Sequence, residues 1–157
     1  MADLKPPRGV DDERATLLSL LQYKRDSMVR KVEGVSEDDA RRALVPSGTT
    51  LLWLTQHVAF AEQIWIVHRF AREDFVAPSD AAIASDTLAE AIENYRATWA
   101  RVDAIVAAHD FDDPCDDTGG GGPTNLRWVL MHLLEETARH AGHADILREL
   151  IDGRTGR

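Results

Sequence analysis

Three side chains that could bind a metal ion lie in helical patterns that are otherwise apolar. His57 stands between Trp53 and Phe60 in a row with helical spacing, and Glu136 and His140 are four residues apart in a later segment. Residues four apart lie on the same face of a helix, one turn from each other. Because an unpaired polar group costs several kcal/mol when it is buried, imidazoles and a carboxylate on such faces need partners.

If the two helices pack side by side, these groups can form a three-ligand metal site. Two imidazole nitrogens and one carboxylate oxygen would leave at least one coordination position for water or a substrate. This ligand set suits Zn²⁺ and is compatible with Ni²⁺, Fe²⁺ or Mn²⁺. His143 is open to three roles: a further ligand, a hydrogen-bond partner of a ligand, or a substrate contact. The alternative is a set of core histidines held by hydrogen bonds, with Glu136 at the surface.

Other motifs give no support to a different reaction. The HLLEE segment at 132–136 lacks the HExxH spacing of zinc proteases, and the GGGGP segment at 119–123 lacks the Lys and Ser/Thr of a phosphate-binding loop. Cys115 is flanked by four aspartates between positions 112 and 117, and their charges oppose thiolate formation. We therefore assign no catalytic residue apart from the expected metal ligands.

Four amphipathic helices are predicted to position these residues. Apolar side chains recur at intervals of three and four over residues 11–33, 51–72, 88–109 and 124–151, which is the helical period. Thr49 or Thr50 can cap the second helix, Thr87 with Glu90 can form a capping box for the third, and Gly153 can end the fourth. Strand patterns are nearly absent. The sequence predicts an all-α four-helix bundle, with linkers long enough for a crossover connection.

The same patterns predict which side chains are buried. In the second helix, one buried row should contain Leu54, Val58, Ala61, Trp65 and His68, and a neighbouring row contains His57. Glu62 lies outside the metal-site pattern, and we expect it to be exposed. Arg25 belongs to a charged face that we interpret as solvated surface. We expect the four tryptophans, Trp53, Trp65, Trp99 and Trp128, to pack the bundle, although any that lies near its mouth could line a ligand pocket.

Composition limits the classes of protein to which this chain can belong. Residues 1–10 are predicted to be a flexible N-terminal arm, and residues 11–153 form one domain. The 157-residue chain has a formal net charge of −9, which disfavours nucleic acid and anionic membranes as partners. No apolar run approaches the roughly 18 residues of a membrane span. With a single cysteine and no hydrophobic leader, a cytoplasmic location is expected.

Two segments together resemble the DinB-like (YfiT-type) superfamily of metal-binding four-helix bundles. They are PSGTTLLWLTQHVAFAEQIW at 46–65 and WVLMHLLEETARHAGHADILRELIDG at 128–153. Over residues 11–153 the chain is most similar to the branch of mycothiol-dependent S-transferases and maleylpyruvate isomerase. The second-helix histidine of the family corresponds to His57. Its fourth-helix pair, which is His-x-x-x-His in many members and Glu-x-x-x-His in the isomerase, corresponds to Glu136 and His140. His143 stands where many members have Gln.

The resemblance implies a divalent metal that binds a low-molecular-weight thiol, such as mycothiol, and promotes its transfer to a small electrophile. A thiol at an open coordination position loses its proton readily because the cation stabilises the thiolate. The nucleophile would then come from this co-substrate and not from Cys115. The expected function is a metal-dependent thiol S-transferase, with a homodimer as a modest preference. A non-enzymatic metal-binding or stress-response module, a metal-dependent hydrolase and a helical interaction protein are the alternatives.

Overall fold

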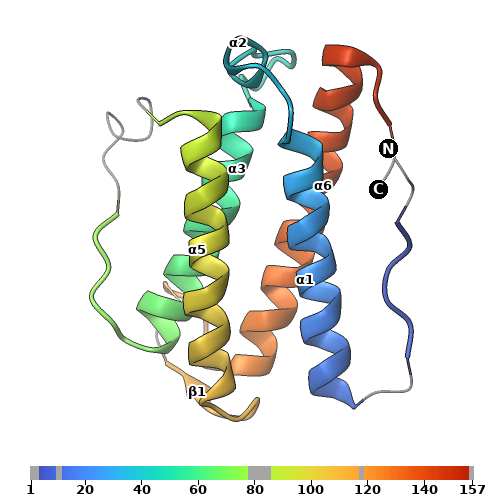
Figure 1. Ribbon diagram of the computed structural model, residues 1–157. Helices are drawn as coiled ribbons and strands as arrows, with labels where there is room; N and C mark the ends of the chain where they lie inside the picture. The colour runs from blue at the N-terminus through green and yellow to red at the C-terminus, as the bar shows by residue number, and fades with distance from the viewer. Residues whose placement is uncertain (1–3, 10–11, 78–85, 117–118, 156–157) are drawn as a thin grey trace.

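Four long helical segments form the fold, as the sequence predicts (Figure 1). The structure, a computed structural model, describes residues 4–9, 12–77, 86–116 and 119–155. In chain order its elements are α1 (Glu13–Val32), α2 (Glu37–Ala40), α3 (Leu51–Glu62), the π-helix η1 (Gln63–Phe70), α5 (Leu88–Ala107), β1 (Pro114–Cys115), β2 (Thr124–Asn125) and α6 (Leu126–Asp152).

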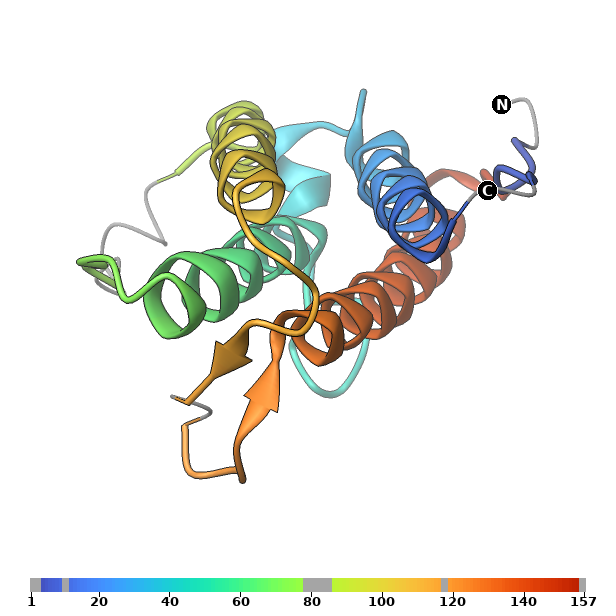
Figure 2. The same ribbon diagram turned by 90° about the horizontal axis from the view of Figure 1, so that it is seen from below.

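The long helices lie in two layers, with α1 and α5 on one side of the bundle and α3 and α6 on the other (Figure 2). Helix α3 packs against both α5 and α6, and α1 packs against α6. Their apolar faces meet in two clusters of buried side chains. One cluster includes Met28, Leu51, Leu54, Tyr95 and Leu147, and the other includes Leu21, Ile66, Val102, Leu126 and Leu130.

The order of the helices includes the predicted crossover connection. Figure 1 shows that α3 and α5 run in the same direction, whereas α1 and α6 run in the opposite one. Two polar contacts support the parallel direction of α3 and α5. Arg41, which precedes α3, donates to the backbone oxygen of Asp86 at 2.6 Å, just before α5 begins. Arg101, near the end of α5, pairs with Glu73, which follows η1. The connection from η1 to α5 must therefore return along the bundle.

Local capping explains where the helices begin and end. The hydroxyl of Thr50 accepts a hydrogen bond from Trp53 N at the start of α3, and the capping box of Thr87 and Glu90 is present at α5. These predictions are confirmed. Helix α6 begins at Leu126 and not at 124, because the Asn125 side chain caps it. It ends at Gly153, whose φ of 74° is a left-handed conformation that glycine adopts without steric cost.

The second predicted helix changes its winding after Glu62. Residues 63–70 form a π-helix, in which hydrogen bonds join residues five apart and each turn holds an extra residue. The residues of the predicted buried row are therefore buried only as far as Ala61. Beyond it, Trp65 is half-buried and His68 is exposed, whereas Ile66 is fully buried. The prediction for the end of this row is wrong because it assumed a uniform α-helical period.

A buried ion pair links α1 to α3. The guanidinium of Arg25 donates to both carboxylate oxygens of Glu62, at 2.9 and 2.6 Å, and it also reaches Asp103 of α5 at 2.8 Å. Arg25 and Glu62 are almost completely buried, so the expectation that they are surface residues is wrong. Burial alone would lower the pKa of Arg25, but the two carboxylates raise it above its usual value. Arg25 therefore stays positively charged inside the bundle.

Two short strands interrupt the all-helical pattern. Pro114 pairs with Asn125 and Cys115 with Thr124 in an antiparallel ladder, which joins the two ends of the glycine-rich segment. Strands of two residues are too short to give a recognisable alternation, so the sequence does not predict them. Cys115 is buried within this pair, away from solvent, which agrees with its interpretation as a poor nucleophile.

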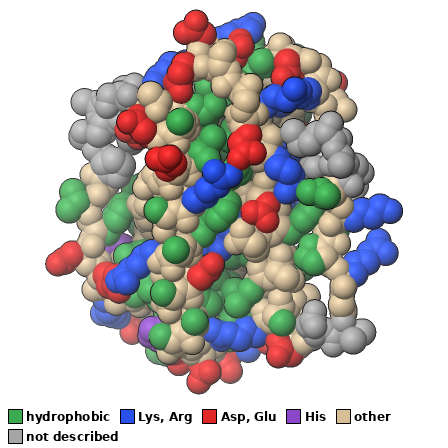
Figure 3. Space-filling model, in the orientation of Figure 1, with side chains coloured by type: hydrophobic (Ala, Val, Ile, Leu, Met, Phe, Trp, Pro, Cys, Tyr) green, Lys and Arg blue, Asp and Glu red, His purple; other side chains and the backbone are tan. Residues whose placement is uncertain are grey.

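The visible surface gives little sign of a single charged face. On the side formed by α1 and α5, acidic and basic side chains alternate among apolar ones (Figure 3). Among the described residues, no helix is both long enough and apolar enough to cross a bilayer. Of the predicted N-terminal arm, residues 4–9 are non-helical, and Tyr23 donates to the Leu4 backbone oxygen at 2.7 Å. Residues 1–3 and 10 of the arm lie outside the described residues.

Replacing Arg25 tests the importance of the buried ion pair. We expect Arg25→Met to reduce the free energy of unfolding by about 3–5 kcal/mol, because it leaves a buried carboxylate without its cation. The double variant Arg25→Met/Glu62→Leu should recover most of this loss. Arg96→Ala, which removes an exposed pair with Glu33, should cost less than about 1 kcal/mol. Denaturant unfolding measures all three; equal losses for Arg25→Met and Arg96→Ala would contradict this assignment.

Candidate metal centre

The three predicted ligands converge where α3 faces α6. Glu136 Oε1 lies 3.1 Å from His57 Nε2 and 3.0 Å from His140 Nε2. One ligand atom from each residue can be chosen so that all three lie within 4.8 Å of one another. All three side chains are partly buried, with Glu136 and His140 less exposed than His57. The packing of α3 against α6 thus brings together the three side chains predicted from the sequence.

The spacing of these atoms fits the coordination of a divalent metal. Bonds of about 2.0–2.2 Å to nitrogen and oxygen, at tetrahedral angles, place two ligand atoms roughly 3.3 Å apart. The two oxygen–nitrogen distances of 3.1 and 3.0 Å are close to this value. The two imidazole rings are 4.6 Å apart between centroids and nearly perpendicular. Two of the three ligand–ligand distances therefore already match the spacing around one ion.

The protonation states of the cluster also suit a metal site. Burial has the largest effect on the pKa of Glu136 and raises it, but hydrogen bonds from His57 and His140 outweigh burial and leave that pKa below its usual value. Burial lowers the pKa of His140, and the Glu136 carboxylate only partly opposes this. At neutral pH the cluster therefore offers an ionised carboxylate and a neutral His140 imidazole, which are the forms that bind metals.

Trp53 lies next to the three candidate ligands, although its sequence pattern predicts a packing role. Its ring stacks on His57 with a centroid distance of 4.7 Å and an interplanar angle of 12°, and it meets the edge of His140 at 6.3 Å. The side chain is 45% exposed, so it forms a wall beside the site and not part of the core. The signal in the sequence is its position one turn before His57.

His143 lies beside the cluster, on the far side of the His140 ring. Its Nδ1 is 3.4 Å from Nδ1 of His140, whereas His140 turns Nε2 toward Glu136. The group of converging ligand atoms does not include His143. Of the three roles left open by the sequence, this geometry favours a hydrogen-bond partner of a ligand.

A second aromatic cluster, made of Trp65, Trp128 and His132, lies nearer the start of α6. His132 stacks on Trp128 at 5.1 Å and meets the edge of Trp65 at 4.9 Å, so His132 does not join the three candidate ligands. Trp128 is 47% exposed. Trp53 and Trp128 therefore do not pack the core, because the face between α3 and α6 is open to solvent at both positions. Trp53 takes the alternative place that the sequence left open, beside the candidate site.

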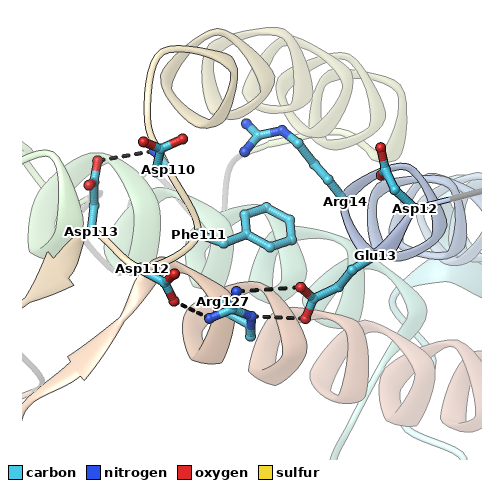
Figure 4. Close-up of a pocket in the computed structure, with 8 residues that line it drawn as sticks. All are labelled: Asp12, Glu13, Arg14, Asp110, Phe111, Asp112, Asp113 and Arg127. Atoms are coloured by element: carbon cyan, nitrogen blue, oxygen red, sulfur yellow. Dashed lines mark hydrogen bonds and ion pairs between the residues drawn. The ribbon is translucent and has the colours of Figure 1, made fainter.

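A pocket of about 510 Å³ lies at the start of α6, and acidic side chains outnumber the two arginines in its lining (Figure 4). Phe111 lies between Arg14 and Arg127, whose guanidinium carbons are 4.8 and 5.7 Å from the ring centroid. Arg127 pairs with Glu13 and Asp112. Thirteen residues of helix, or about 20 Å, separate Arg127 from His140. This pocket joins the ends of α1, α5 and α6 and is separate from the candidate metal centre.

Titration of His140 tests the electrostatics of the cluster. In metal-free protein we expect the pKa of His140 to lie below its ordinary value of 6.5, because the ring is partly buried. Glu136→Gln should lower that pKa further, since the carboxylate favours the protonated ring. NMR titration of the histidine ring signals measures both values. A pKa above 6.5 in the wild type, or a rise in the variant, would show that this description is wrong.

Comparisons with known proteins agree with this fold and with the family resemblance. A solved structure titled as a conserved protein of a locus from Enterococcus faecalis superposes with a TM-score of 0.69, at 15% sequence identity. The match covers 92% of this chain and all of that one, and it shows that the fold is shared. No curated protein matches the sequence. The family model described as mycothiol S-transferase matches residues 16–153, and the chain therefore belongs to the mycothiol S-transferase family.

Proposed function

We propose that this protein is a divalent-metal-dependent S-transferase that activates a low-molecular-weight thiol of the mycothiol type for attack on a small electrophile. His57, Glu136 and His140 hold the metal. The observation that carries the proposal is the position of Glu136 Oε1, about 3 Å from Nε2 of both histidines. Membership of the mycothiol S-transferase family supports the thiol as the co-substrate. Zn²⁺ is the expected ion, with Ni²⁺, Fe²⁺ and Mn²⁺ as alternatives.

The bound cation would supply one kind of chemistry, which is stabilisation of the thiolate form of the co-substrate. Two neutral imidazoles and one carboxylate carry a single negative charge, so they leave a divalent site with a net positive charge that attracts the thiolate. The protein's only cysteine, Cys115, is buried in the β1–β2 pair. The nucleophile must therefore be brought by the co-substrate.

The residues around the ligands hold the imidazoles in place. Trp53 covers one face of the His57 ring and limits its rotation. When His140 binds metal through Nε2, its Nδ1 carries the proton and can donate to Nδ1 of His143. Such an outer hydrogen bond fixes the orientation of a ligating histidine. We therefore assign His143 to positioning His140 and not to the ligand set.

Loss of either histidine should abolish metal retention. We expect about one divalent ion per chain in protein purified without added metal, and almost none in His57→Ala or His140→Ala, because two remaining ligands hold an ion weakly. Elemental analysis of the purified proteins measures the metal. His68→Ala is the matched control, since this imidazole on η1 is exposed and remote from the ligands. Metal-free wild type, or undiminished metal in both ligand variants, would refute the assignment.

Turnover separates the proposed reaction from its alternatives. With metal, mycothiol and a model electrophile such as a bromobimane, we expect conjugation that disappears when the metal is removed and returns when it is restored. Glu136→Ala should reduce this rate by at least 100-fold, because it removes one of three ligands and the negative charge of the site. Product formation without thiol would indicate a hydrolase. Metal binding without turnover of any electrophile would indicate a non-enzymatic metal-binding protein.

A further inference from the structure

A small pocket of about 140 Å³ lies next to the candidate metal centre, and His143 connects the two because it lines the pocket and contacts His140. It lies between the turn that precedes α3 and the second half of α6. Its described lining residues are Val45, Ser47, Thr49, His143, Ile146 and Leu147. Gly48 shapes this turn: its N–H donates to the Val45 oxygen at 3.0 Å, and its φ of 76° is unfavourable for other residues.

The chemistry of the lining limits what can bind. Three of the six lining side chains are aliphatic, and none of the described lining residues carries a fixed charge. An anion would therefore lose its hydration without gaining a cation in return. The hydroxyls of Ser47 and Thr49 are 2.9 Å apart, so one donates to the other. The acceptor of that bond still has its own proton, and it can donate to an oxygen of a ligand.

The volume limits the size of the ligand. An apolar cavity of about 150 Å³ holds one benzene molecule, so a pocket of about 140 Å³ has room for roughly six non-hydrogen atoms. That is the size of a carbonyl group with a short alkyl chain. Ile146 is 57% exposed and stands at the open side of the pocket, where a longer chain would extend into solvent.

We propose that this pocket binds the electrophile of the reaction, and that the electrophile is a small uncharged carbonyl compound such as an alkyl vinyl ketone. This inference rests on the proposed function. The alkyl chain lies against Ile146 and Leu147, and the carbonyl oxygen accepts a hydrogen bond from the hydroxyl pair. In the addition, the thiol sulfur forms a bond to the β carbon, the π bond of the alkene breaks, and the thiol proton ends on the α carbon. No other reactant is needed.

Unreactive ketones test the pocket without any turnover. The probes are acetone, 2-butanone, 2-pentanone, 2-hexanone and 2-octanone, titrated into the full-length protein and followed by methyl NMR of Ile146, Leu147 and Thr49. We expect saturable shifts and a two- to fourfold gain in affinity per added methylene, levelling off near 2-pentanone. Hexanoate should bind at least tenfold more weakly than 2-hexanone. Absence of saturable shifts, or equal binding of hexanoate, would overturn the proposal.

Paired variants show whether the ligand occupies this pocket. Ile146→Phe narrows its open side and should weaken 2-hexanone binding roughly tenfold, the loss expected when about two methylenes are left unburied. Leu150→Phe is the control, because Leu150 is 55% exposed on the same helix and does not line the pocket. Thr49→Val removes one hydroxyl at nearly constant shape and should weaken every ketone by a similar factor. Equal effects of the two Phe variants would contradict the assignment.

Turnover then distinguishes this inference from the function on which it rests. With metal and mycothiol, kcat/KM for a series of alkyl vinyl ketones should follow the chain-length dependence of ketone binding, and Ile146→Phe should remove that dependence. A kcat/KM that depends neither on chain length nor on the Ile146→Phe substitution would overturn the assignment of the pocket. It would leave the proposed transferase activity unaffected. Ketone binding without conjugation of any electrophile would refute the transferase, while the pocket would stand as a site for small carbonyl compounds.

Discussion

The antiparallel packing of α3 against α6 is the constraint on which the candidate site depends. Because the helices run in opposite directions, a residue later in α3 and η1 faces a residue earlier in α6. One register therefore accounts for two clusters: His57 meets Glu136 and His140, and Trp65 meets Trp128 and His132. A slip of α6 by one turn, about 5.4 Å, would separate Glu136 from His57. The site exists only while the apolar faces on either side of it hold this register.

Charged side chains inside the bundle help to hold that register. The pair of Arg25 and Glu62 ties α1 to α3, and Asp103 extends it to α5. Arg148 of α6 is buried and donates to the backbone oxygens of Lys31 and Glu33 at the end of α1. A buried ion pair contributes little net stability compared with apolar side chains of the same shape. Its geometry, however, permits few alternative arrangements of the helices.

The fold and the three candidate ligands were accessible from the sequence for the same reason. Apolar periodicity defined the helices, and His57, Glu136 and His140 interrupted that periodicity with residue types that need partners. Arg25 and Glu62 were missed because each has an ordinary position on an amphipathic helix. Their burial depends on a partner 37 positions away, which no local pattern contains.

The features around the site were less predictable because they depend on three-dimensional neighbours. Trp53 fits an apolar row, and only the structure shows that its ring leaves the core to stack on His57. Ser47 and Thr49 lie in a turn without periodicity, so their proximity to His143 depends on how that turn meets α6. Residues 63–70 retain a helical composition, and the change to π winding leaves no residue type that marks it.

Because of the π-helix, the number of residues between 63 and 70 determines which side chains face the core. Each residue of a regular helix advances the side chains by about 100°, and the eight residues of the π segment advance them by less, so the segment holds an extra residue. Deletion of one residue between 63 and 70 would therefore permit regular winding and keep the later side chains near their present faces. If all eight residues took regular winding instead, Ile66 and Phe70 would turn away from the core, whereas His57, which precedes the altered segment, would keep its orientation. A change in the number of residues in this stretch should therefore affect the packing of η1, while the orientation of the candidate ligand His57 on α3 stays the same.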